Sequence, residues 1–102
     1  MKRTIEQLAR KQGRIYVYLS DDAVGAAFLR QAEAEGFTFT DGEPPTKRPY
    51  ARVMALNRDK TLHYVGFVGM TAFGAPARRV NGERLLRVDY AKYAAGEAAF
   101  LL

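Results

Sequence analysis

The sequence predicts a single α+β domain over residues 1–102: an N-terminal helix, a strand–helix–strand unit, and antiparallel hairpins that form one mixed sheet with helices on one face. Three observations support this prediction. The length of 102 residues fits one domain with a modest core. Hydrophobic residues make up 48% of the chain and charged residues 26%, as in ordinary globular proteins. Helical and alternating hydrophobic patterns follow one another along the chain, with no point where a second domain begins.

The chain begins with a capped helix and a strong strand. Thr4 and Gln7 form a capping-box pattern, so we expect a short helix that runs to about Gln12 and ends at Gly13. Residues 14–19 are β-branched or aromatic at nearly every position, with aliphatic side chains on one face and two tyrosines on the other. This composition predicts a central strand.

A helix and a second strand follow. Residues 20–22 supply the N-terminal cap of a helix over 23–35, and Gly36 is placed to end it. Residues 37–40 alternate between apolar and polar and predict the next strand. A strand–helix–strand unit over residues 14–41 usually joins parallel strands through a right-handed crossover.

The middle of the chain predicts a loop and an antiparallel hairpin. Residues 41–49 contain three prolines and a glycine, so they form a loop, and loops of this length are often functional. Residues 52–56 and 61–68 read as two strands joined by a polar turn at 57–60.

The end of the chain predicts a second hairpin and a short helix. The dipeptide Asn81–Gly82 is the strongest turn signal in the sequence and lies between two alternating segments. Asp89 is placed to cap a helix from Tyr90 to Ala95. Residues 98–102 are apolar, so we expect them to dock on the core or on a second subunit, which predicts a homo-oligomer.

The composition narrows the class of protein. The absence of cysteine excludes disulfides and thiolate metal sites and suits the cytoplasm. No apolar run has the length of a signal peptide or a membrane span, so neither secretion nor a membrane partner is expected. The net charge of +5 favours nucleic acid, nucleotides or an acidic protein surface as partners, although it can also serve only to keep the chain soluble.

The residues that usually perform catalysis are scarce. His63 is the single histidine, and no acidic residue near it has the spacing of a metal ligand. Ser20 is the single serine and stands where a helix cap belongs. We therefore expect a binding protein without catalytic residues, metal or cofactor, and His63 as a general base is the weaker enzyme alternative.

Cations interleaved with aromatic residues predict the binding chemistry. Arginine and lysine bind phosphate, and tyrosine stacks on flat rings, so these residue types suit an anionic, nucleotide-like ligand. The candidate ligand-binding residues are Tyr16, Tyr18, Lys47, Arg48, Tyr50, Arg58, Lys60 and His63. The alternative is a nucleic-acid-binding hairpin that uses Arg78, Arg79, Arg84 and Arg87.

Part of the chain resembles a group of small phage proteins. The strand at residues 14–19, the helix that ends in Ala32–Gly36 and the segment Phe37–Gly42 are similar to many small uncharacterised proteins of bacteriophages and prophages. The resemblance covers about residues 14–68. It implies a phage accessory protein in the host cytoplasm that inhibits a host defence system by binding a nucleotide-type signal or an effector protein stoichiometrically. No catalytic residue is implied by the resemblance.

Overall fold

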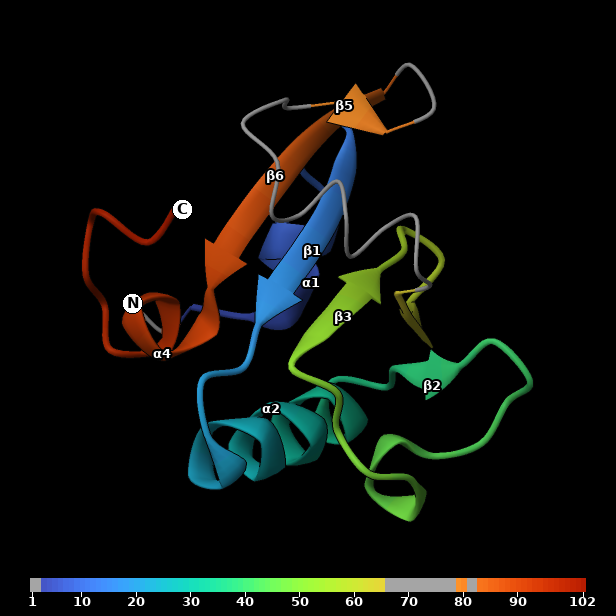
Figure 1. Ribbon diagram of the computed structural model, residues 1–102. Coiled ribbons are helices and arrows are strands. Elements are labelled where there is room, and N and C mark those ends of the chain that lie inside the picture. Colours follow the sequence, from blue (N-terminus) through green and yellow to red (C-terminus); the bar gives the residue numbers. More distant parts are fainter. Residues whose placement is uncertain (1–2, 66–78, 81–82) are drawn as a thin grey trace.

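A computed structural model describes residues 3–65, 79–80 and 83–102, and for residues 79, 80 and 83 it describes the backbone alone. In these ranges, three α-helices and a short 3-10 helix accompany a six-stranded mixed sheet (Figure 1). The α+β class predicted from the sequence is therefore confirmed. The predicted continuation of a strand over residues 66–68, the turn at 81–82 and Arg78 lie outside the described residues.

The sheet has the strand order β2-β4-β3-β1-β6-β5, so β1 lies in its interior. In chain order the strands are β1 (Arg14–Tyr18), β2 (Thr38–Phe39), β3 (Val53–Leu56), β4 (Thr61–Tyr64), β5 (Arg79–Val80) and β6 (Glu83–Asp89).

The directions of the strands agree with the predicted mixed sheet and add one pairing that the sequence analysis did not specify. The predicted hairpins are present, because β3 pairs antiparallel with β4 and β5 pairs antiparallel with β6. Strands β1 and β2 run in the same direction, as the strand–helix–strand pattern predicts, but β3 and β4 lie between them. On its other edge β6 pairs parallel with β1, a contact that the sequence analysis did not specify within the predicted mixed sheet. No short turn joins these two strands, so no local sequence signal reports their direction.

Helix α1 (Ile5–Ala9) begins as predicted and ends earlier than expected. The hydroxyl of Thr4 accepts from the Gln7 backbone N–H, and the Gln7 side chain accepts from the Thr4 N–H, so the capping box is confirmed. The helix was expected to reach Gln12. It stops because residues 10–12 are exposed and add nothing to its buried side, and the Lys11 N–H turns back to the Leu8 carbonyl at 3.1 Å.

Helix α2 (Asp22–Ala34) is capped at both ends within the predicted segments, but its N-cap is Asp21, so the expectation that Ser20 stands at the cap position is wrong. The Asp21 carboxylate accepts from the Val24 N–H at 2.9 Å. At the other end Gly36 has a φ of +87°, and the Phe37 N–H donates to the Ala32 carbonyl at 2.9 Å. This is a Schellman arrangement, which requires a residue that adopts the left-handed backbone conformation and explains the glycine.

The carboxylate of Glu35, just after α2, binds the first turn of α1. It accepts from the backbone N–H groups of Ile5 and Glu6, each at 2.8 Å, and from the Gln31 side chain at 2.6 Å. These N–H groups have no partner inside a helix, and a carboxylate at this end also complements the helix dipole. Glu35 therefore joins the two helices through a tertiary cap.

The remaining elements lie near the chain's long loop and its end. A 3-10 helix, η1 (Pro45–Lys47), lies in the predicted loop. Helix α4 (Tyr90–Ala94) is capped by Asp89, whose carboxylate accepts from the Lys92 N–H as predicted. None of the helices among the described residues is long and apolar enough to cross a membrane.

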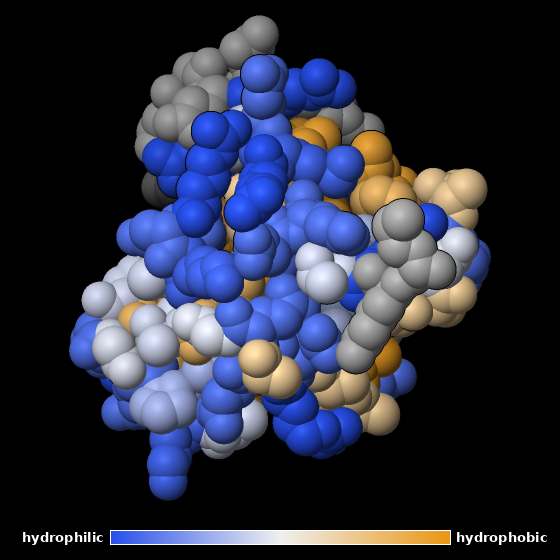
Figure 2. All heavy atoms as spheres, turned by 180° about the vertical axis from the view of Figure 1, so that it is seen from behind, coloured by the Kyte–Doolittle hydropathy of each residue, from blue (hydrophilic) through white to orange (hydrophobic). Residues whose placement is uncertain are grey.

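Two clusters of buried side chains form the core of the described residues. Buried residues of α1, α2 and α4 form one cluster with β-strand residues such as Val17 and Met54, and α1 lies behind β1 in Figure 1. A second, smaller cluster on the other face contains Tyr16, Val53, Ala55 and Leu85. Seen from behind, the surface is mostly hydrophilic (Figure 2).

The C-terminal tail pairs with the outer edge of β6. The Asp89 N–H donates to the Phe100 carbonyl and the Leu102 N–H donates to the Arg87 carbonyl, both at 2.8 Å. Phe100 packs against the core, whereas Leu101 remains 54% exposed and Leu102 44% exposed. The tail thus docks on the protein's own core, and the predicted second subunit stays a prediction.

Replacement of Glu35 by Gln tests the tertiary cap. The amide oxygen can accept from one of the two backbone N–H groups, but the amide NH₂ then faces the other. We expect the free energy of unfolding, measured by urea denaturation with circular dichroism, to fall by about 1–3 kcal/mol. Glu97→Gln, at an exposed position, makes the same change of charge and should leave stability nearly unchanged. Equal effects of both variants would contradict the cap.

Candidate functional site

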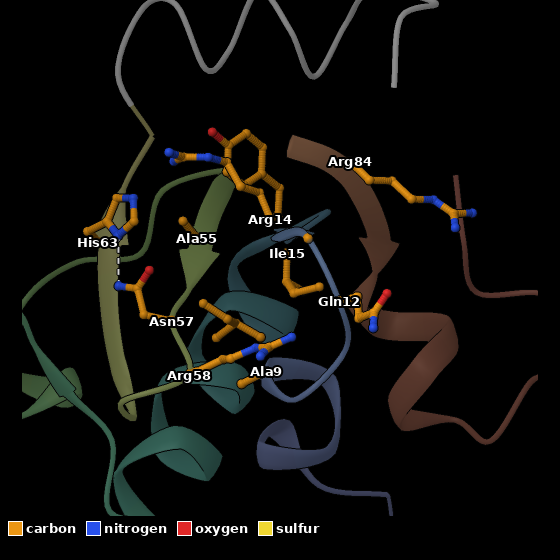
Figure 3. Close-up of a pocket in the computed structure, with 12 residues that line it drawn as sticks. Ala9, Gln12, Arg14, Ile15, Ala55, Asn57, Arg58, His63 and Arg84 are labelled. Carbon is orange, nitrogen blue, oxygen red and sulfur yellow. Dashed lines mark hydrogen bonds between the residues drawn. The ribbon is translucent and has the colours of Figure 1, made fainter. Parts of the chain in front are cut away.

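A cavity of about 600 Å³ lies at the end of the sheet where β1 begins and β3 ends (Figure 3). Four parts of the chain line it: the end of α1 with the start of β1, the end of β3 with the following turn, His63 of β4, and Arg84 of β6. His63 and Asn57 lie on one side, and Gln12 and Arg84 lie on the opposite side (Figure 3). The volume is within the usual range for a small-molecule site.

Gly13 allows the chain to pass close to β6 at this cavity. Its φ is +90°, and a Cβ at this position would lie 2.3 Å from the carbonyl oxygen of Arg84. The next residue, Arg14, pairs in register with Leu85. The close approach therefore places two arginines, from β1 and β6, beside one cavity.

The register of β1, β3 and β4 places three of the lining side chains on the same face of the sheet. Tyr16 is opposite Ala55, and Ala55 is opposite His63, so these three residues share one face. Tyr16 is 4% exposed and belongs to the smaller buried cluster. Its ring consequently forms part of the wall and is packed against neighbours.

The cavity has a positive charge. Arg14, Arg58 and Arg84 line it, and none of its described lining residues is acidic. Nη2 of Arg58 donates to the Lys11 carbonyl at 3.3 Å, which holds this side chain across the turn. The Arg84 side chain extends away from His63 (Figure 3), so its guanidinium lies apart from those of Arg14 and Arg58. Such a set of donors suits an anion with several acceptor oxygens.

His63 is held neutral at the cavity wall. Nδ1 of its ring lies 3.0 Å from Nδ2 of Asn57. Burial and, to a smaller degree, the guanidinium of Arg14 lower the pKa of His63 below its ordinary value of 6.5. At neutral pH the ring is therefore mostly uncharged, and the positive charge of the described cavity lining comes mainly from arginine.

The described residues offer no metal centre. No group of three or more His, Asp or Glu side chains in the described part of the chain is arranged to hold a metal ion. The three arginines of the lining carry positive charge, which repels cations. The site's chemistry is that of hydrogen-bond donation to an anion.

The structure brings together some of the residues predicted from the sequence. Tyr16, Arg58 and His63 line the cavity, and Arg84, predicted for the nucleic-acid alternative, lines it too. Tyr18 lies on the same strand face as Tyr16, at the other end of β1, and does not line the cavity.

The predicted cations of the long loop have partners of their own. Arg48 forms ion pairs with Asp41 and Glu43, and its guanidinium lies 4.9 Å from the centre of the Phe39 ring. A hydrogen bond from the Glu43 backbone N–H, and to a smaller degree one from the Arg48 side chain, lower the pKa of the Asp41 carboxyl. Lys47 is exposed on η1 and lies outside the cavity.

Tyr50 and Lys60 also make contacts within the fold. The Tyr50 ring packs on Gly25 of α2, where a Cβ would come within 2.3 Å of it, and its hydroxyl donates to Asp22 at 2.5 Å. Nζ of Lys60 lies 3.1 Å from the Glu6 carboxylate and lowers the pKa of that group. Both side chains are engaged in these contacts, and neither lines the cavity.

The arginines of the last hairpin do not form one row. Arg84 and Arg87 are three residues apart on β6, so their side chains point to opposite faces of the sheet. The backbone of Arg79 pairs with that of Arg84, and Arg78 lies outside the described residues.

Three polar residues of the cavity, Gln12, Arg14 and Asn57, were missed by the sequence analysis. Arg14 alternates with Tyr16 and Tyr18 on one strand face, and this period of two is a signal that could have identified it. Asn57 reads as an ordinary turn residue. Its contact with His63 depends on the hairpin register, for which the sequence has no marker.

Comparison with protein-family models, curated proteins and solved structures finds no match for this chain. The resemblance to phage proteins therefore remains a prediction, and the class of protein rests on the fold and the cavity.

Gly13→Ala tests the close approach that forms the cavity. The variant adds the strain of a positive φ to the overlap with the Arg84 carbonyl, so we expect a loss of stability on the order of 2–4 kcal/mol. Gly42→Ala is the matched control, because Gly42 has a φ of +89° and no atom within 4 Å of its would-be Cβ. Its loss should be about 1–2 kcal/mol in the same urea denaturation. Equal losses would show that the overlap is relieved at no cost.

Arg14→Gln tests the electrostatic link to His63. Removal of a nearby positive charge favours the protonated ring, so the pKa of His63 should rise, as measured by NMR titration of its ring protons. Arg30→Gln, an exposed position on α2, should leave the titration unchanged. In the wild type, the pKa of His63 is lower in the folded than in the unfolded chain, so the unfolded chain binds the proton first as the pH falls. The free energy of unfolding of the wild type should therefore fall as the pH drops below about 6.5. An unchanged titration in Arg14→Gln would contradict the link.

Proposed function

We propose that this protein binds a small anionic, nucleotide-sized ligand in the cavity between β1, β3 and β6, and releases it chemically unchanged. The observation that carries the proposal is the cavity of about 600 Å³ that three arginines line and that has no acidic residue among its described lining. Guanidinium groups bind phosphate through paired, charge-assisted hydrogen bonds, which supports a phosphorylated ligand.

The mixed character of the walls supports a ligand that is more than a bare ion. Ala9, Ile15, Ala55 and Leu56 contribute apolar surface beside the arginines. Apolar contact area and a few placed polar groups are the usual composition of a site for an organic ligand. A nucleoside phosphate combines both kinds of surface.

In its biological role, the protein acts by occupancy. As the phage resemblance implies, stoichiometric binding of a nucleotide-type signal would lower its free concentration inside the host. Under this proposal an effector protein is not needed as the direct target.

Titration calorimetry with adenosine monophosphate and with pyrophosphate tests the proposal. We expect saturable binding of one ligand per cavity that weakens with added salt. The variants Arg14→Gln and Arg58→Gln should each weaken binding about tenfold or more, because each removes a charge-assisted hydrogen bond of about 1.5–3 kcal/mol. Arg30→Gln controls for the loss of one positive charge elsewhere.

Three results would count against the proposal. The first is the absence of binding for both compounds. The second is equal loss in Arg30→Gln and Arg14→Gln, which would indicate attraction to net charge alone. The third is chromatographic recovery of an altered nucleotide, which would indicate turnover. Tight, salt-dependent binding of a single-stranded oligonucleotide in place of either small compound would favour the nucleic-acid alternative.

A further inference from the structure

A chain of hydrogen bonds runs along the β3–β4 turn to His63. The Thr61 hydroxyl lies 2.5 Å from the Asp59 carboxylate. Nδ2 of Asn57 lies 3.0 Å from the Thr61 hydroxyl oxygen and also 3.0 Å from Nδ1 of His63. The dashed contact in Figure 3 is the last of these.

The direction of each bond follows from its neighbour. A carboxylate accepts only, so the Thr61 hydroxyl donates its single proton to Asp59. The Thr61 oxygen can then accept only, which requires that Asn57 turns its NH₂ group toward it. The second hydrogen of the same NH₂ group points at Nδ1 of His63. Nδ1 is therefore an acceptor without a proton, and the neutral ring has its proton on Nε2.

The surroundings of His63 keep it in this state. Arg14 of β1 is the charged side chain whose field acts on the ring, and it opposes a second proton. Asp59 acts on the ring only through Thr61 and Asn57, and Ala55 is the neighbour on β3. The ring nitrogen without the contact to Asn57 lies on the side that faces Arg14 (Figure 3).

We propose that Asp59, Thr61 and Asn57 hold His63 as a neutral hydrogen-bond donor, and that its Nε2–H and the Arg14 guanidinium together bind an anionic oxygen of the ligand. Thr61 and Asn57 are positioning residues, because they act through His63. The ligand group at this subsite has free lone pairs, as phosphate or carboxylate oxygens do, and has no proton to give. This inference rests on the proposed function for its ligand, although the state of the ring is independent of it.

The subsite has a consequence for pH dependence. A neutral donor needs no protonation event, so the affinity for adenosine monophosphate should be flat between about pH 7 and pH 8.5, where the phosphate is already dianionic. A site that required a charged imidazole would lose affinity across this range.

The variant Thr61→Val tests the positioning chain without altering a residue that lines the cavity. Without the hydroxyl, the Asn57 amide is free to turn over and present its oxygen to Nδ1. Nitrogen NMR of the ring at pH 8 should show a pyridine-type Nδ1 in the wild type and a shift toward a protonated Nδ1 in the variant. Thr38→Val, at the position paired with Thr61 in the neighbouring strand, is the matched control and should give the wild-type spectrum.

Two further variants keep the test decisive. Asn57→Asp places an obligate acceptor at Nδ1, so its spectrum should show a protonated Nδ1 even if Thr61→Val folds poorly. His63→Phe keeps a ring and removes the donor, and should weaken adenosine monophosphate binding about five- to tenfold, the value of one hydrogen bond.

The outcomes separate the two proposals. A protonated Nδ1 in the wild type would overturn the positioning chain. Wild-type affinity in His63→Phe would overturn the subsite and leave the proposed function in place. If the wild type binds none of the tested anions, the proposed function and the ligand subsite both fail, while the spectra still decide the state of His63.

Discussion

The parallel pairing of β1 with β6 is the constraint on which the rest of the structure depends. It brings the start of the chain against its end, and Gly13 is required where the two backbones meet, because any Cβ would overlap the Arg84 carbonyl. With β6 on one side and β3 on the other, β1 has both edges paired, and its aliphatic face packs under the three helices. The cavity lies beside this contact, so the stability of the fold and the position of the candidate site have the same origin.

The fold places the cationic side chains of this protein in two different environments. Arg48 pairs with two carboxylates of its own loop, and Lys60 joins the β3–β4 turn to Glu6 of α1. Arg14, Arg58 and Arg84 instead gather around a cavity without a described acidic lining residue. A cation that already has a counterion offers little further attraction to a ligand, whereas guanidinium groups beside a cavity can donate charge-assisted hydrogen bonds to an anion. The position of these three arginines at one cavity, which the net charge alone does not show, is the reason to propose binding there.

His63 illustrates how a residue's neighbours decide its chemistry. A lone histidine in a sequence is compatible with a base, an acid, a metal ligand or a packed ring. In this structure its Nδ1 is engaged by Asn57 and its pKa is lowered by burial and by Arg14. A ring in this state is suited to donating a hydrogen bond to an anion, which agrees with the arginines around it. The proposed stoichiometric binding requires only this hydrogen bond from His63 and no proton transfer.

Local signals in the sequence determined the elements of this protein. The capping box at Thr4, the Asp21 cap and the Gly36 stop are interactions within a few residues, so their patterns can be read directly. The same holds for the β3–β4 hairpin, whose strands are joined by a short turn. Only the tertiary structure decided that β6 lies parallel to β1, that Glu35 caps α1 and that Arg14 and Asn57 meet His63 and Arg84 at one cavity. These contacts join residues far apart in the chain, and their energies depend on packing and register, for which no short stretch of sequence has a pattern.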